Sequence, residues 1–538
     1  MKSSPSVLRD FTVDHRVWLL SGVAIGIGIC ATGLAVILLR LIAISTNLFY
    51  YHRLSAVSVS PAGSPLGLWM ILVPIAGGLI VGFMARFGSD KIRGHGIPEA
   101  IEAILLHRAK VQPKIALLKP ISAAIAIGSG GPFGAEGPII MTGGAFGSLV
   151  AQLMHVTDAE RTTLLVAGAA AGMSATFATP VAAILLAVEL LLFEWRPRSL
   201  VPVAVASTTA AILRVYWLGA GPLFHMPALP EGLSLLTALG ALALGGILGL
   251  VAAGMSRMMY AFEDLFERLE HHFHIHWMWW PALGGIGIGV GGFFFPRGLG
   301  VGYDNIAQLL QGSAGLDLIL GILIAKSLMW AFSLGSGTSG GVLAPLLMIG
   351  GAVGALFAHL AHATPEAQTF WALLGMGSML AGSLGVPLTA VLFSLEVTHC
   401  LPALLPLTIA CISAYLVTSL LMPRSILTEK LSRRGYHLSR EYGVDPLEQV
   451  IVRDLMSPPA QTEPPEFFTY SDGTARAAAE IMSTEGFSTL AVIDRETGQI
   501  CGTLSLHDLL RGRSHSIERE TERLRLMGYI SPEEGGHN

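Results

Sequence analysis

A glycine-rich stretch of the sequence, GSGGPFGAEGPIIMTGG from Gly128 to Gly144, contains one ionisable side chain, Glu136. A helix that begins inside such a stretch presents unpaired backbone N–H groups and the positive end of its dipole, which together solvate an anion. A carboxylate beside those groups can occupy the place of the anion, and protonation would release it. The stretch therefore predicts a helix terminus that can solvate an anion, with Glu136 beside it. The alternative interpretation is a first-turn glutamate that only caps its helix.

The glycine-rich stretch occurs twice in the chain. GSGGPFGAEGPIIMTGGAFGSL, from Gly128, matches GSGTSGGVLAPLLMIGGAVGAL, from Gly335, without a gap. Glu136 has no counterpart carboxylate, because its partner in this match is Leu343. The same offset pairs three further sets of residues on either side: Lys119 with Lys326, Pro180 with Pro387 and Glu189 with Glu396. The sequence therefore predicts two related halves.

The composition requires these halves to lie in a membrane. Hydrophobic residues make up 52% of the chain, charged residues 13%, and the mean hydropathy is +0.62, whereas soluble domains carry about 25% charged residues. Several charge-free runs reach the ~20 residues that a spanning helix needs: Val17 to Leu39, Leu66 to Ala85, Leu233 to Ser256, Ser327 to Pro365 and Val397 to Pro423. Duplicated halves with Gly- and Pro-interrupted helices are typical of transporters that bind their substrate where the halves meet.

The paired charged residues have a structural and an electrostatic interpretation. Because Glu189 and Glu396 occur at equivalent positions, we expect both to satisfy buried N–H groups. Lys119 and Lys326 are candidates for raising the electrostatic potential along the path of an anion. The alternative is that these lysines lie near helix ends and extend their amines towards the membrane surface.

Four segments, GHGIPEA, GAEGP, GGVLAP and SILTEKLSRRG, resemble the diagnostic segments of the CLC family of chloride channels and proton/chloride exchangers. The resemblance implies an all-α membrane fold of two inverted repeats with many tilted and broken helices, and a homodimer in which each subunit has its own anion pathway. It implies that Glu136 is the gate. It also implies anion-binding positions in and beside the motifs: His95, Gly96, Ile97, Gly134, Ala135, Gly137, Gly341, Val342, Leu343 and Leu427.

Some of these positions depart from the family pattern. His95 replaces the usual serine of the first motif, although an imidazole can still donate a hydrogen bond to an anion. Leu343 and Leu427 replace an aromatic residue and a tyrosine, so the usual hydroxyl donors are missing. Leu190 stands where exchangers of the family usually carry a second glutamate, and Glu194 lies one turn further along.

These departures leave three hypotheses about transport. The nonpolar Leu190 favours channel-like, passive conduction of chloride or a similar small anion. The first alternative is a proton-coupled chloride antiporter, and a remote alternative is a cation-coupled secondary transporter. An enzyme with a phosphate-binding loop is disfavoured, because no GK[ST] follows the glycines. No metal site, resident cofactor or nucleic-acid partner is predicted.

The C-terminal part of the chain is more highly charged and has the pattern of a small soluble domain. It resembles a CBS module, an α/β domain that in some relatives binds adenine nucleotides. Its segment GTLSLHD would place Ser505 and Asp508 on the nucleotide ribose. The alternative is a structural cap, since an aspartate at a helix start is an ordinary N-cap. Only one copy of the module is evident, although such modules work in pairs.

These patterns predict the following domains: a cytosolic segment, 1–16; the transmembrane domain, 17–435, with repeat halves of about 17–218 and 233–430; a linker, 436–450; the CBS-like domain, 451–513; and a charged tail, 514–538. Basic residues from Arg86 to Arg93 and from Arg424 to Arg440 orient the chain with its C-terminal domain in the cytoplasm. We therefore expect a multi-pass protein of the cell membrane whose partners are small anions, protons, lipid and a second copy of itself.

Overall fold

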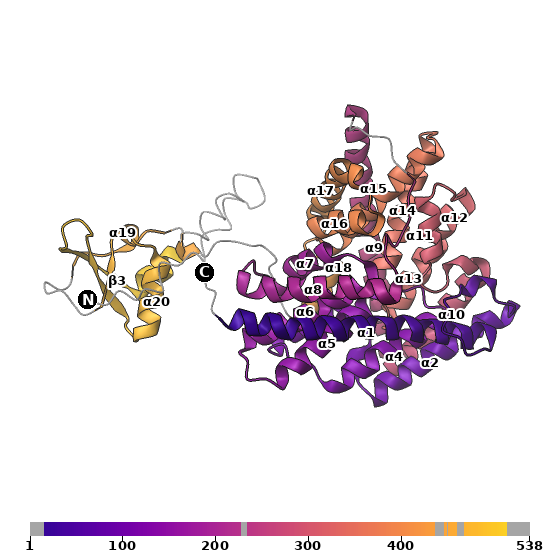
Figure 1. Cartoon of the computed structure of the whole chain (residues 1–538), viewed down its shortest axis with the longest axis horizontal. Coiled ribbons are helices and arrows are strands. Elements are labelled where there is room, and N and C mark those ends of the chain that lie inside the picture. The colour runs from indigo at the N-terminus through magenta and orange to yellow at the C-terminus, as the bar shows by residue number, and fades with distance from the viewer. Residues whose placement is uncertain (1–14, 228–233, 436–445, 449, 460–466, 514–538) are drawn as a thin grey trace. The chain divides into compact units, whose positions relative to one another are not determined.

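The structure is a computed structural model that describes residues 15–227, 234–435, 446–448, 450–459 and 467–513 (Figure 1). These residues belong to two compact units, one ending at residue 435 and the other beginning at residue 446. The first unit is built from long and short helices: α1 (Arg16–Tyr51), α2 (Leu72–Phe87), α3 (Ile97–Leu106), α4 (Pro113–Gly128), α5 (Glu136–Gln152), α6 (Asp158–Phe177), α7 (Pro180–Leu186), α8 (Pro197–Leu218), α9 (Leu235–Phe273), α10 (Trp280–Phe294), α11 (Tyr303–Leu310), α12 (Leu316–Gly321), α13 (Ser327–Gly335), α14 (Leu343–Leu360), α15 (Pro365–Leu384), α16 (Pro387–Thr398), α17 (Leu404–Leu421) and α18 (Ile426–Arg433).

Short turns of tighter or wider helix connect or extend these elements. The 3-10 turns of the first unit are η2 (Pro61–Gly63), η3 (Gly67–Ile71), η4 (Asp90–Ile92), η6 (Trp277–Trp279), η7 (Pro296–Gly298) and η9 (Leu401–Ala403). Two π-helical turns, η5 (Ala187–Leu192) and η8 (Ile322–Lys326), extend α7 and join α12 to α13. π-helical turns are uncommon and often occur at functional sites.

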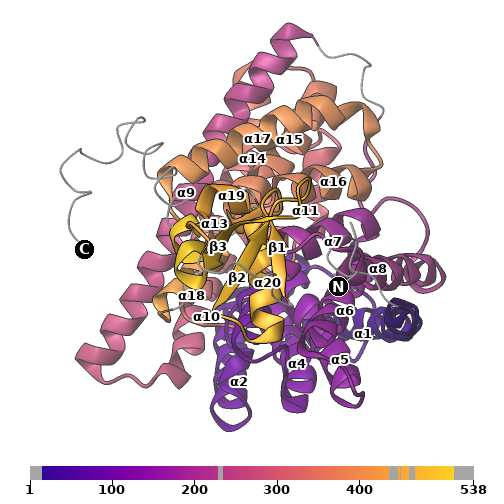
Figure 2. The ribbon, with the colours of Figure 1, turned by 90° about the vertical axis from the view of Figure 1, so that its left-hand side faces the viewer.

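The helices repeat in the order that the sequence repeat predicts. α5, α6, α7 and α8 begin at positions equivalent to the first residues of α14, α15, α16 and α17. In Figures 1 and 2 the helices of the first half gather on one side of the unit and most of those of the second half on the other. The helix α10 crosses this division and packs against α2. The predicted duplication is therefore confirmed.

Helix lengths follow from local sequence. Pro180 and Pro387 open α7 and α16, where a missing backbone N–H has no cost. The helices before them, α6 and α15, end at Ala178 and Gly385, which both take the left-handed conformation that stops a helix. These equivalent stops leave two short helices, α7 and α16, that do not cross the whole membrane.

Other helices are long and apolar enough to span a bilayer. Among the described residues these are Arg16–Tyr51, Gly67–Phe87, Pro197–Leu218, Leu235–Phe273, Leu316–Gly335, Leu343–Leu360 and Leu401–Arg433. The predicted all-α polytopic membrane fold with broken helices is confirmed.

Two glutamates join the halves at the short helices. The carboxylate of Glu396, in α16, accepts hydrogen bonds from the backbone N–H groups of Val181 (3.0 Å) and Ala182 (2.8 Å), at the start of α7. The carboxylate of Glu189 accepts from the N–H groups of Leu388 (3.2 Å) and Thr389 (2.9 Å), at the start of α16. Each glutamate therefore satisfies the free N–H groups of a helix in the other half, which confirms the structural role predicted for both.

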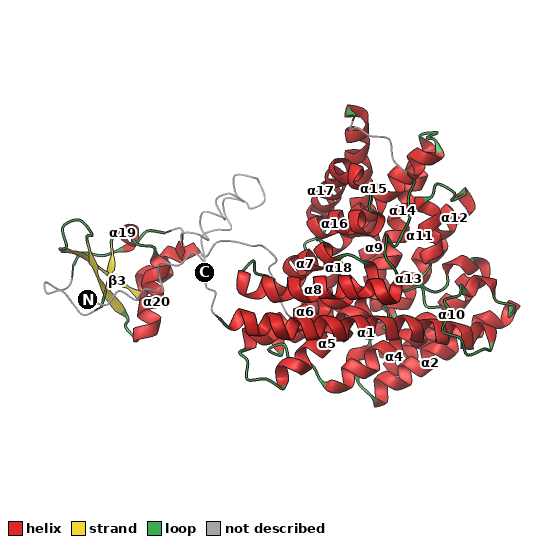
Figure 3. Cartoon of the chain, in the orientation of Figure 1, coloured by secondary structure: helices red, strands yellow, loops and turns green. Residues whose placement is uncertain are grey.

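The second unit is a small α/β domain. It contains η10 (Pro446–Glu448), α19 (Val452–Leu455), β1 (Phe468–Tyr470), α20 (Ala475–Glu485), β2 (Thr489–Ile493) and β3 (Ile500–Ser505). The strand order is β1-β2-β3, with β1 parallel and β3 antiparallel to β2. In Figure 3 all strands of the described residues lie in this unit. Between β2 and β3, hydrogen bonds from the backbone N–H and hydroxyl of Thr497 hold the pKa of Asp494 below its usual value.

Candidate anion site at the junction of the two halves

The two glycine-rich stretches meet backbone to backbone. Gly134 and Gly341 form an antiparallel bridge, in which the N–H of Gly134 donates to the carbonyl of Gly341 (3.1 Å) and the N–H of Gly341 donates to the carbonyl of Gly134 (2.8 Å). The exchange of bonds between equivalent residues is what an approximate two-fold axis between the halves produces. It brings the N-termini of α5 and α14 together inside the unit.

Glu136 is the first residue of α5 and is completely buried. Its carboxylate lies against Gly134 and Gly341, because a methyl group added to either glycine would overlap or crowd a carboxylate oxygen. The carboxylate interacts with the backbone N–H groups of Glu136 itself and of Ala344, in α14. Neither carboxylate oxygen makes a hydrogen bond of good geometry. The negative group therefore lies between two helix N-termini, where an anion would be solvated.

The first motif lies next to Glu136. His95 and Ile97 are buried, and Gly96 begins α3 with φ +91°, a conformation that favours glycine. A methyl group at Gly137 would overlap the carbonyl oxygen of His95, so the first motif and the start of α5 are in close contact. Both ring nitrogens of His95 are buried without a hydrogen-bond partner. The predicted residues of α3, α5 and α14 thus converge on one place.

A buried ion pair fixes the start of α3. Glu99 accepts a hydrogen bond from the N–H of Gly96 (2.8 Å) and pairs with Lys430 of α18 (2.8 Å). This links the last helix of the membrane unit to the motif that contains His95. Sequence analysis missed the pair, although the glutamate directly follows the proline of GHGIPEA.

The paired lysines are fully buried, and neither extends towards the membrane surface. Lys119 donates to the carbonyls of Ile92 and Gly94, both at 2.8 Å, and Lys326 donates to the carbonyl of Gly300 at 2.7 Å. Each lysine thus holds the loop before the motif of its own half. The snorkelling alternative is wrong for both, because their amines are bonded to buried carbonyls.

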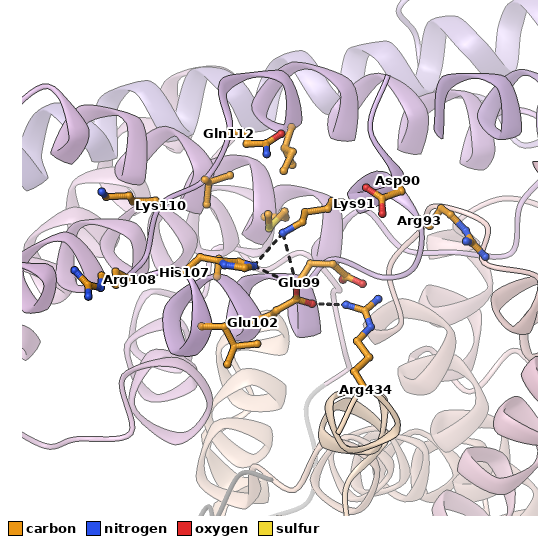
Figure 4. Close-up of a pocket in the computed structure, with 15 residues that line it drawn as sticks. Asp90, Lys91, Arg93, Glu99, Glu102, His107, Arg108, Lys110, Gln112 and Arg434 are labelled. Carbon is orange, nitrogen blue, oxygen red and sulfur yellow. Dashed lines mark hydrogen bonds and ion pairs between the residues drawn. The ribbon is translucent and has the colours of Figure 1, made fainter. Parts of the chain in front are cut away.

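Two cavities lie near the first motif. One, of about 500 Å³, is lined by His95 together with Arg93, Glu263 and Lys430, so it connects the motif with residues near the end of α9 and in α18. The other, of about 710 Å³, is drawn in Figure 4, where Lys91 and His107 point towards Glu102, and Arg434, the residue after α18, also approaches Glu102. Both cavities therefore include residues in or directly after the last helix of the membrane unit.

The remaining predicted residues occupy three different settings. Leu427 is buried in α18, which packs against α3. Leu190 is buried in the π turn η5, away from water. Glu194 is partly exposed and forms ion pairs with Arg196 (3.4 Å) and Arg198 (3.5 Å), so its charge is compensated outside the anion site.

Ser505 and Asp508, in the C-terminal unit, bond to each other. The Ser505 hydroxyl donates to the carboxylate of Asp508 (2.6 Å), which also accepts from the Ser505 N–H (3.0 Å), and the Asp508 N–H donates back to the hydroxyl (3.2 Å). This reciprocal pattern caps the helix 506–513 with Ser505 as the N-cap and Asp508 in the first turn, so Asp508 is not itself the N-cap that the structural alternative expected. Binding of an adenine nucleotide there stays a prediction.

The first unit is thus a duplicated helical membrane domain in which the N-termini of α5 and α14 meet, and the second unit is a small α/β module. Residues 77–419 match the protein family described as voltage gated chloride channel, and residues 452–515 match the CBS domain. The first match covers more than half of the chain, so the chain belongs to the CLC family of anion-transporting membrane proteins. The resemblance predicted from the four motifs is confirmed.

Relatives and solved structures agree with this assignment. The H(+)/Cl(-) exchange transporter ClcA of Citrobacter koseri is 31% identical over 365 residues, covering 65% of this chain and 76% of that protein. The structure of a slow cyanobacterial Cl-/H+ antiporter matches with a TM-score of 0.68 and 21% identity, over 79% of this chain and 99% of that one. A CLC-type fluoride/proton antiporter matches with a TM-score of 0.64 and 20% identity, over 77% and 98%. The structural matches support the fold.

Proposed function

We propose that this protein is a proton-coupled anion antiporter with chloride as a substrate. The observation that carries the proposal is the position of Glu136, whose buried carboxylate lies between the N-termini of α5 and α14. A carboxylate and an anion compete for the same N–H groups, and a proton decides between them. A group that both binds a proton and displaces an anion is what coupled exchange requires.

The relatives favour this hypothesis over the channel-like one that Leu190 suggested. The names of a curated relative and of two structural neighbours describe proton-coupled exchange. Leu190 supplies no second protonatable group. However, the cavity lined by His95 and Glu263 brings ionisable side chains to the motif that contacts Gly137. Ionisable groups that can carry protons towards Glu136 therefore lie near it, although position 190 has no carboxylate.

In the proposed cycle, the deprotonated carboxylate of Glu136 occupies the site and excludes the anion. Protonation neutralises the carboxyl group and weakens its attraction to the helix N-termini, so the anion can replace it. His95, Gly96, Ile97 and the backbone from Gly341 to Leu343 would line the anion on the two sides of the junction. Assembly as a homodimer stays a prediction.

The test is transport by the purified full-length protein in liposomes. A chloride gradient without a proton gradient should drive protons uphill, measured with a pH-sensitive dye together with chloride efflux. Chloride efflux without proton movement would instead support the channel hypothesis. Vesicles that release no chloride faster than protein-free vesicles would contradict both.

A further inference from the structure

The hydroxyl group of Tyr303 is a buried donor that the proposed cycle does not use. Its oxygen is inaccessible to solvent and has no hydrogen-bond partner among the described residues. Leaving such a group unpaired is unfavourable, and a native fold that does so usually has a ligand or water to satisfy it. By contrast, the hydroxyl of buried Tyr50 donates to the carbonyl of Ser129 (3.0 Å) and that of Tyr260 to the carbonyl of Ile426 (2.5 Å).

The backbone around Tyr303 is held in place by the second half. Tyr303 is the first residue of α11, after Gly302 with φ +81°. It is the counterpart of Ile97, the first residue of α3, in the match of GHGIPEA with GVGYDNI. Three residues before it, the carbonyl of Gly300 accepts a hydrogen bond from the amine of Lys326 (2.7 Å). The start of α11 therefore occupies, in the second half, the position that the predicted anion-binding motif occupies in the first.

The ring of Tyr303 is fixed by aromatic packing. It makes edge contacts with Phe177, at a centroid distance of 6.5 Å and an angle of 85°, and with Phe224, at 6.0 Å and 68°. Such contacts orient a ring and exclude water from it. The direction of the hydroxyl is thus set by side chains from α6 and from the loop after α8.

One acidic group acts on this hydroxyl electrostatically without forming a hydrogen bond to it. The carboxylate of Glu136 lies within electrostatic range of Tyr303 and Lys326, and the Lys326 amine lies beside the start of α11, since a methyl group added to Gly302 would come within 3.4 Å of its nitrogen. Both oxygens of that carboxylate, like the hydroxyl, are buried without a well-formed hydrogen bond. A buried donor and a buried acceptor that lie near one another and both lack hydrogen-bond partners indicate that a small charged species forms hydrogen bonds there during function.

We infer that the Tyr303 hydroxyl donates a hydrogen bond to the transported anion, and so replaces the hydroxyl donors that His95 and Leu427 do not provide. This inference rests on the proposed function, because it requires an anion at the junction. It assigns one wall of the anion site to the start of α11, in the second half of the chain. A neutral phenol suits this role, since it donates a hydrogen bond without a charge that would hold the anion permanently.

The test compares Tyr303→Phe with Tyr50→Phe in the full-length protein. Chloride affinity of the purified protein is measured by calorimetric titration, and chloride efflux is measured in liposomes. Tyr303→Phe should weaken chloride binding roughly tenfold, or about 1.4 kcal/mol, because a hydrogen bond to a charged group is lost. Its melting temperature without chloride should not fall, because the lost hydroxyl has no protein partner. Tyr50→Phe should lower the melting temperature and leave chloride affinity unchanged.

Three results would overturn the inference. They are an unchanged chloride affinity in Tyr303→Phe, an affinity loss of the same size in Tyr50→Phe, and a failure of Tyr303→Phe to fold, which would assign the hydroxyl to the fold. A faster efflux with unchanged affinity would count against it too, because the hydroxyl would then restrain Glu136 rather than bind the anion. If the wild-type protein itself neither binds nor releases chloride, the proposed function fails instead.

Discussion

Position 136, at the start of α5, carries a carboxylate, whereas the equivalent position at the start of α14 carries the side chain of Leu343. The two helix starts otherwise share the preceding glycine, their buried setting and the hydrogen bonds between Gly134 and Gly341. In the proposed cycle, equivalent backbones would solvate an anion from both sides, and the one carboxylate would make the site respond to protons. The difference between the halves locates the gate more sharply than either half alone.

The buried lysines show a second difference between the halves. Lys119 interacts electrostatically with Glu99, in its own half. Asn305 lies at the position equivalent to Glu99, and its side-chain amide donates a hydrogen bond to the carbonyl of Arg297 (2.8 Å). The charged group that interacts with Lys326 is instead Glu136, in the other half. We therefore expect Lys326 to influence Glu136, and Lys119 to influence the ion pair of Glu99 instead.

The largest effect is expected from Glu136→Ala. Proton uptake driven by a chloride gradient should fall to background, because no group remains that exchanges a proton for the anion. Chloride efflux should continue and lose its dependence on pH. Both quantities are measured in the same liposomes.

The matched variant is Leu343→Met, at the equivalent position of the second half. Its volume is conserved, so it should cost less than about 1.5 kcal/mol of stability and keep the wild-type ratio of protons to chloride. Loss of coupling in Leu343→Met as well would show that the gate does not depend on the carboxylate. Retained coupling in Glu136→Ala would show that the proton is carried elsewhere.

A smaller effect is expected from Lys326→Met. The positive charge of Lys326 favours the ionised form of Glu136, so its removal makes protonation easier. The midpoint of the pH dependence of chloride efflux should therefore move to higher pH, by roughly one pH unit. The measurement is efflux as a function of pH in liposomes with equal pH on both sides.

Lys119→Met serves as the comparison for Lys326→Met. It should leave the pH midpoint in place, and it should lower stability by about 1–3 kcal/mol because the carbonyls of Ile92 and Gly94 lose a buried partner. Equal shifts of the pH midpoint in the two variants would mean that both lysines act through the electrostatic potential of the whole unit, and not through one nearby carboxylate. An unshifted midpoint in Lys326→Met would remove this lysine from the gate.

The fold and the position of Glu136 at a helix start were predictable because they depend on spacing along the chain. The gapless repeat gave the equivalent helix starts, and glycine and proline marked where helices stop inside the membrane. The common role of Glu189 and Glu396 was predictable for the same reason, since the repeat shows both at once.

Contacts across long sequence separations were not predictable in this way. Glu99 and Lys430 are 331 residues apart, and no periodicity relates them. The hydroxyl of Tyr303 stands out only once packing shows that it has no partner. The electrostatic difference between Lys119 and Lys326 likewise depends on which carboxylate the fold brings near each amine, although their sequence positions are equivalent.

The smallest expected difference between the two halves is the difference in stability between variants of Glu189 and Glu396, the glutamates that join them. Glu189→Gln and Glu396→Gln each replace a carboxylate at a helix N-terminus by a neutral amide, which weakens the interaction with the helix dipole and leaves one N–H less well bonded. Each should lower the free energy of unfolding by about 1–2 kcal/mol, with Glu189→Gln at the upper end because Glu189 also accepts from the Thr389 hydroxyl (2.5 Å). The ratio of protons to chloride should not change in either variant. Thermal unfolding in detergent and coupled transport in liposomes check the two statements. A loss of proton coupling in Glu189→Gln alone would give this residue a role in proton transfer and break the equivalence of the two glutamates.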